Sequence, residues 1–115
     1  MIITLPTVDL HVQIVRFVLD HQPAIVTCEI VDAGGSRHTF IGKVWMFLDQ
    51  NLNADSPYPL PGAIRCAVLN RWRDASGREL VEVNTADPDF IESTEELSEF
   101  VVLQDQISAR ADELG

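Results

Sequence analysis

Histidine and cysteine are the residue types best suited to acid–base or metal chemistry in this chain, which has three histidines and two cysteines. A histidine that acts as a general base needs a carboxylate to orient it and must reach the substrate. Asp20 adjoins His21, but neighbouring residues of a strand point to opposite faces, and the sequence offers His38 no evident partner. We therefore expect turn or surface histidines. A small hydrolase or isomerase that uses His21 or His38 is the third functional hypothesis.

Cys28 and Cys66 do not form a Cys-x-x-Cys pair, and each alternates with apolar residues. That pattern predicts two reduced thiols that pack as small apolar side chains on the inner faces of strands. A zinc site needs more ligands at suitable spacing, and the carboxylates of Asp87 and Asp89 are more typical of a solvated turn. The sequence predicts no metal site and no cofactor.

The motifs of common enzyme families are missing from the sequence. There is no phosphate-binding loop, dinucleotide fingerprint, HExxH or EF-hand pattern, and Ser36 lacks the Gly-x-Ser-x-Gly context of a nucleophile elbow. These absences favour a binding protein over an enzyme.

The charge is concentrated at one end of the chain. The net charge is −10, and residues 86–115 contribute −8 of it, from nine acids and one arginine. Such a charge disfavours nucleic acid as a partner and favours a basic protein surface. We expect the partner to contact an acidic set in this segment: Glu92, Glu95, Glu96, Glu99 and Asp105.

Four of the eight basic residues lie within fourteen positions, at Arg65, Arg71, Arg73 and Arg78. By strand parity Arg65, Arg71 and Arg73 share one face. The acidic end could fold back over this face, or the arginines could stay available for a partner. We favour the first arrangement, because the end also carries apolar residues that would help to dock it.

Two hairpins dominate the predicted structure. Residues 24–31 and 37–48 are two strands joined by a Gly-Gly turn, and residues 64–73 and 78–85 are two more. Residues 8–19 form an earlier strand whose mixed parity indicates a bend, and Gly42 indicates a bulge. A proline-rich loop of about fourteen residues separates the hairpins.

The acidic end is also expected to be folded. The sequence predicts a short turn at 93–97, a strand at about 99–103 and a helix at about 104–114, with one continuous helix from Thr94 as the alternative. The chain is thus predicted to be one domain, residues 1–115, mainly β with a C-terminal helix. Its strands, five or six in number, would form a small antiparallel barrel or a strongly bent sheet.

The leading functional hypothesis is a small acidic binding protein of inhibitor type, with an immunity-like protein as its specific form, that recognises a basic protein surface. The second hypothesis is a β-barrel that binds a small molecule near Trp45 and Tyr58. No run of about 18 apolar residues and no secretory signal is found, so we expect a cytoplasmic protein without membrane contacts. Pairing of two copies through a strand edge remains open.

Overall fold

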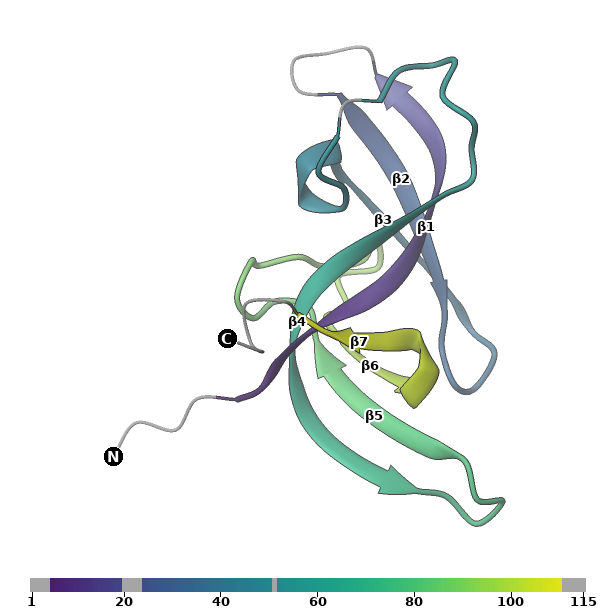
Figure 1. Cartoon of the computed structure of the whole chain (residues 1–115), viewed down its shortest axis with the longest axis vertical. Helices are drawn as coiled ribbons and strands as arrows, with labels where there is room; N and C mark the ends of the chain where they lie inside the picture. The colour runs from purple at the N-terminus through teal and green to yellow at the C-terminus, as the bar shows by residue number, and fades with distance from the viewer. Residues whose placement is uncertain (1–4, 20–23, 51, 111–115) are drawn as a thin grey trace.

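The structure is a computed structural model that describes residues 5–19, 24–50 and 52–110 (Figure 1). The described part forms one antiparallel sheet in the order β3-β2-β1-β4-β5-β6, with β7 beside β1. The strands are β1 (Thr7–Leu19), β2 (Ile25–Val31), β3 (Arg37–Lys43), β4 (Leu60–Arg73), β5 (Glu79–Asn84), β6 (Glu99–Leu103) and β7 (Ile107–Ala109). Two short 3-10 turns, η1 (Val44–Met46) and η2 (Gln104–Gln106), complete the elements. The mainly β class and the bent antiparallel sheet predicted from the sequence are confirmed.

The sheet curls into a half-barrel whose edge strands, β3 and β6, are joined by loop segments. At one end of the gap the Ala33 N–H donates to the Val101 carbonyl at 2.8 Å, and further along the Thr94 N–H donates to the Thr39 carbonyl at 2.8 Å. At the other end Ala63 of β4 donates to the Phe47 carbonyl at 2.8 Å. These contacts enclose the core without a continuous ladder between β3 and β6.

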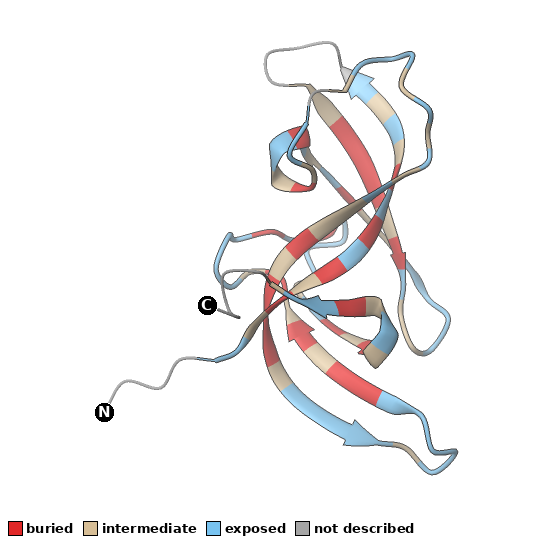
Figure 2. Cartoon of the chain, in the orientation of Figure 1, coloured by how far each residue is buried: buried red, intermediate tan, exposed pale blue. Residues whose placement is uncertain are grey.

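Inward-facing residues of every long strand build the core, and Figure 2 shows them alternating along the middle of the sheet. The largest fully buried side chains include Phe40, Leu10, Ile14 and Ile64. Phe100 of β6 packs edge-on against Phe40, with ring centroids 5.7 Å apart. The acidic end is therefore a structural part of the core. No helix in the described ranges is long and apolar enough to cross a membrane.

The bend predicted in β1 is confirmed, whereas the bulge predicted at Gly42 is wrong. The pairing of β1 with β2 shifts register between Ile14 and Arg16 and again between Phe17 and Leu19. β3 pairs regularly with β2 through Gly42 and then ends at Lys43. Glycine at position 42 instead leaves room for the Met46 side chain, because a Cβ there would lie 2.9 Å from the Met46 sulfur.

At the C-terminal end the predicted turn at 93–97 and the strand at 99–103 are confirmed, and the helix is wrong. Residues 104–106 form η2 and residues 107–109 pair with β1 as β7. The continuous helix from Thr94 is also wrong, since Glu96 has a left-handed φ of 64°. Of the apolar residues at helical spacing that the structure describes, Phe100 and Leu103 belong to β6 and Ile107 belongs to β7. Residues 111–114 of the predicted helix lie outside the described residues.

The predicted arginine face is divided by a bulge. β4 shifts register against β5 between Val68 and Asn70, which reverses the pleat. Arg71 and Arg73 consequently lie on the face of their partners Val81 and Glu79, opposite to the face of Arg65. The parity count from the sequence failed because one extra residue moves every later side chain to the other face.

Gly62 is required by the close approach of the segment after η1. A Cβ at this position would lie 2.9 Å from the Phe47 carbonyl oxygen and 3.1 Å from the Ile14 side chain. We predict that Gly62→Ala lowers the free energy of unfolding by about 1–3 kcal/mol, measured by urea denaturation. Gly34→Ala is the matched control, because its nearest atom lies at an ordinary 3.4 Å. Equal midpoints for the two variants would show that this contact does not constrain the barrel.

Both cysteines lie in the core, as predicted, and both thiols are free. Burial raises the pKa of Cys28 to about 12, and burial together with the charge of Asp9 raises the pKa of Cys66 to about 12. Because the thiolate is the reactive form, we predict no reaction with a disulfide reagent at pH 8 in the folded protein and reaction of both thiols in urea. Rapid labelling of the folded chain would contradict this burial.

Candidate functional site

The turn η1 places one aromatic side chain outside the core. Val44 and Phe47 are three positions apart and both are buried, whereas Trp45 between them is 65% exposed. A 3-10 turn puts residues i and i+3 on the same side, so Val44 and Phe47 anchor the segment while Trp45 points outward. The turn is joined to the sheet by the Val44 N–H, which donates to the Ala24 carbonyl at 2.9 Å.

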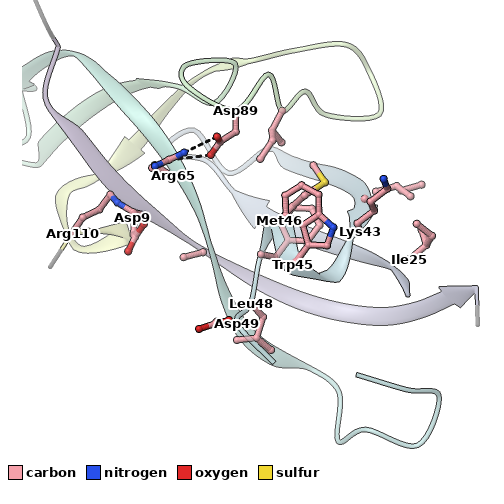
Figure 3. Close-up of a pocket in the computed structure, with 15 residues that line it drawn as sticks. Asp9, Ile25, Lys43, Trp45, Met46, Leu48, Asp49, Arg65, Asp89 and Arg110 are labelled. Carbon is pink, nitrogen blue, oxygen red and sulfur yellow. Dashed lines mark hydrogen bonds and ion pairs between the residues drawn. The ribbon is translucent and has the colours of Figure 1, made fainter. Parts of the chain in front are cut away.

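Trp45 lies in a groove with a volume of about 890 Å³ (Figure 3). Figure 3 shows Lys43, Trp45 and Met46 together in one part of this groove, and Asp9 and Arg110 at the far end, beyond Arg65 and Asp89. Its wall consists of β3 and η1, parts of β1 and β4, and the loop after β5. The lining residues are Asp9, Ile25, Ile41, Gly42, Lys43, Trp45, Met46, Phe47, Leu48, Asp49, Ala63, Arg65, Asp89, Ile91 and Arg110.

Two arginine–carboxylate pairs form the polar end of the groove. Arg65 of β4 binds Asp89 with two hydrogen bonds, of 2.7 and 3.1 Å. Arg110 binds Asp9, which is also the cross-strand neighbour of Arg65. Bidentate geometry fixes the position of the loop after β5, although half-exposed pairs of this kind each stabilise the fold by only about 0–1 kcal/mol.

The loop that carries Asp89 presents a second aromatic side chain. Phe90 is 86% exposed and has a left-handed φ of 58°. Its backbone is held from inside the protein: the buried Thr85 hydroxyl donates to the Ile91 carbonyl at 2.7 Å, and the Phe90 N–H donates to the Ala86 carbonyl at 2.9 Å. Phe90 therefore sits between two residues that line the groove, Asp89 and Ile91, and its own side chain is left in solvent.

All five acidic residues expected to contact a partner are exposed: Glu92, Glu95, Glu96, Glu99 and Asp105. Within the described ranges none of the five forms an ion pair, and Asp89 is the one acid of residues 86–110 that does. Arg73 and Arg78 pair with nearer carboxylates, Glu79 and Asp74, and Arg71 donates to the side-chain carbonyl of Gln104 at 2.7 Å. The expected docking of the acidic end on the arginines is therefore found in part: Asp89 binds Arg65 and Gln104 binds Arg71, whereas Arg73 pairs with Glu79.

The structure does not bring together the two aromatic residues predicted to bind a small molecule. Trp45 lines the groove, whereas Tyr58 packs against the core and its hydroxyl donates to the Asn53 carbonyl at 2.7 Å. Tyr58 is not among the groove residues. Its place in the proline-rich loop suggested an exposed position that this hydrogen bond and the core contacts replace.

His38, which lacked an evident partner in the sequence, binds a carboxylate. Its Nε2 lies 2.7 Å from Oδ2 of Asp32, and its ring packs on Phe100 at 4.8 Å between centroids. Nδ1 is buried and has no hydrogen-bond partner in the described part of the chain. This nitrogen faces protein rather than a substrate cleft, so the pair joins the β2–β3 turn to the core. His21 lies outside the described residues.

Asp32 is the hub of that turn, since its Oδ1 accepts the N–H groups of Gly34 and Ser36 at 2.9 Å each. Burial acts to raise the pKa of Asp32, but the hydrogen bonds from His38, Ser36 and Gly34 outweigh burial, so the pKa is lowered.

No cluster of three or more His, Cys, Asp or Glu able to hold a metal occurs within the described ranges. No family model, curated protein sequence or solved structure matches this chain.

Several groove residues were missed by the sequence analysis. Ile41 and Met46 look like ordinary apolar strand residues until the end of β3 at Lys43 is known. Phe90, which lies on the loop beside the groove and not in its lining, had one usable signal: it is a lone aromatic residue in an acidic stretch after a predicted strand. The pairing of Arg65 with Asp89, 24 positions away, had none.

The lowered pKa of Asp32 predicts a pH-dependent contribution to stability. A carboxyl whose pKa is lower in the folded state stabilises the protein above its unfolded value of about 3.9, and this stabilisation is lost as the pH falls through the folded pKa. We predict that Asp32→Asn costs about 1 kcal/mol at pH 7, by urea denaturation, and that this cost shrinks below about pH 4. Asp55→Asn is the control, because Asp55 is exposed and its carboxylate makes no hydrogen bond in the described structure. A cost for Asp32→Asn that is constant from pH 3 to pH 7 would contradict the assignment.

Proposed function

We propose that this protein is a non-catalytic binding protein that recognises a basic protein surface at the groove beside Trp45. The observation that carries the proposal is the exposure of two large apolar side chains in one groove, Trp45 at 65% and Ile41 at 52%, and of Phe90, at 86%, on the loop between the groove residues Asp89 and Ile91. Large exposed apolar patches are typical of interaction sites, and tryptophan is enriched among the few residues that dominate the binding energy of protein interfaces. An inhibitor-type or immunity-like role is the specific form of this proposal.

The backbone of Phe90 supports a role in binding rather than in folding. A left-handed φ costs a residue with a Cβ about 1 kcal/mol or more, and glycine or asparagine would adopt it more easily. The side chain of Phe90 recovers none of this cost by burial, since 86% of it is exposed. An aromatic side chain kept at such a position has its use outside the folded monomer.

The charge beside the groove supports a basic partner. Residues 86–99 hold six acids and no base, and Asp89 alone among them is in an ion pair within the described structure. Five carboxylates therefore add a negative field to an apolar surface, which speeds association with a positive partner and weakens with salt. Apolar contacts would supply affinity, and these acids would supply orientation and speed.

The test is quantitative capture of partners from a lysate of the source cells at low salt. We predict that Trp45→Ala and Phe90→Ala each reduce recovery of the specific partner at least tenfold, because truncation of a central aromatic at an interface costs about 2 kcal/mol or more. Trp72→Ala is the matched control: Trp72 is also exposed, at 39%, but lies on the β4–β5 hairpin away from the groove. Capture that is unchanged by Trp45→Ala and Phe90→Ala, or reduced equally by Trp72→Ala, would contradict the proposal.

A small molecule is the second candidate occupant of the same groove. The core of the half-barrel is filled by side chains such as Phe40 and Leu10, so a ligand would bind outside the sheet. The groove volume of about 890 Å³ lies within the range of small-molecule sites, about 300–1,000 Å³. Stabilisation by a library compound that is lost in Trp45→Ala but not in Trp72→Ala would favour this candidate.

The His38–Asp32 pair gives little support to the third candidate, an enzyme. His38 is 11% exposed, and its second ring nitrogen is buried. A general base needs a nitrogen that can reach the substrate proton. The groove is lined by neither residue of the pair.

A further inference from the structure

The hydrogen-bond pattern of β3 leaves part of its outer edge without a partner. The Val44 N–H donates to the Ala24 carbonyl, and the Asp32 N–H donates to the Ser36 carbonyl. In an antiparallel ladder every second residue pair is hydrogen-bonded, so these two bonds show which residues of β3 face β2. By this alternation Phe40 and Gly42 bond to β2, whereas Thr39, Ile41 and Lys43 point their N–H groups away from it. The bond from Thr94 to the Thr39 carbonyl on that outer edge agrees with this assignment.

Cover of the β3 edge stops before the groove begins. Thr94 pairs with Thr39, but no hydrogen bond within the described residues reaches the Ile41 N–H, the Ile41 carbonyl or the Lys43 N–H. Ile41, Gly42 and Lys43 all line the groove, so the groove borders this part of the β3 edge. Exposed strand edges are normally covered, twisted away or blocked, since they template pairing with another chain.

We propose that an extended segment of a partner protein adds to the sheet at Ile41–Lys43, as an extra strand that lies in the groove. This inference rests on the proposed function and specifies its mode of binding. Strand addition uses main-chain hydrogen bonds for affinity and pockets for alternate side chains for specificity. Here one face of the added strand would meet Trp45 and Met46, which lie beside Lys43 in Figure 3.

Charge indicates which segment would fit. The charged residues that line the groove balance, with Asp9, Asp49 and Asp89 against Lys43, Arg65 and Arg110. The excess negative charge lies outside the lining, at Glu92, Glu95 and Glu96, which surround Thr94, the residue bonded to Thr39 on the same edge of β3. The occupant is therefore an extended peptide in which lysine or arginine alternates with apolar residues.

The first test uses an acetylated and amidated heptapeptide of alternating lysine and valine as the probe, observed by NMR hydrogen exchange. We expect saturating peptide to slow exchange of the Ile41 amide at least tenfold and to leave the Phe40 amide, already bonded to β2, unchanged. Because the N–H groups of alternate residues in an extended peptide point to opposite edges, backbone N-methylation of the valines removes the donors of one edge of the peptide, and methylation of the lysines removes those of the other. We expect one methylated peptide to bind at least tenfold more weakly than the other. Equal binding of both methylated peptides, or no protection of Ile41, would overturn strand addition.

The second test uses Ile41→Pro, which removes the outward N–H without breaking the ladder to β2, with Ile41→Val as the control. We expect Ile41→Pro to reduce both peptide binding and partner capture at least tenfold while melting near the wild type. Partner capture that depends on Trp45 and Phe90 but not on the Ile41 N–H would preserve the proposed function and overturn strand addition. A concentration-dependent dimer of the wild type that is lost in Ile41→Pro would make a second copy the occupant and overturn the assignment to a partner.

Discussion

The constraint on which this structure depends is the closure of a six-stranded half-barrel whose edge strands do not meet. An antiparallel sheet of this size must cover one apolar face, and here it curls around Phe40, Leu10 and Ile14. The gap between β3 and β6 is bridged by a few backbone bonds, from Ala33 to Val101 and from Thr94 to Thr39. The segment 44–48 fills the remaining opening, and its approach to β4 requires glycine at position 62.

The candidate site is a consequence of this closure. Because segment 44–48 anchors itself through Val44 and Phe47, Trp45 has no place in the core. Because the 93–97 turn pairs with β3 at Thr39 alone, the edge beyond it stays open into the groove. The loop after β5 is fixed from inside by Thr85 and from outside by the bidentate contact of Asp89 with Arg65. The backbone at Phe90 is thereby fixed while its side chain is in solvent, which reduces the backbone entropy that a partner must remove on binding.

Local patterns predicted most of the fold, and long-range contacts account for what they missed. Alternation and turn residues identified both hairpins, the bend in β1 and the strand at 99–103, since these signals depend on neighbours in sequence. The predicted helix at 104–114 failed over its described part because Ile107 at helical spacing is equally suited to a short strand beside β1. The prediction that Arg65, Arg71 and Arg73 share one face was wrong because the bulge near Leu69 leaves no signal in the sequence. At the site, Trp45 was among the residues named from the sequence, but Asp89 and Ile91 line the same groove from a segment more than forty positions away, which no local pattern indicates.

The measurement that tests the central claim most directly is site-specific photo-crosslinking in the source cells. A benzoylphenylalanine residue would replace Phe90 in one variant and Trp72, on the β4–β5 hairpin, in another. The account predicts a discrete covalent adduct with one protein from position 90, reduced by salt, and none from position 72. The adduct peptide should be basic and extended in that partner. No adduct from position 90, or the same adducts from both positions, would contradict the claim that the groove beside Trp45 is the binding surface.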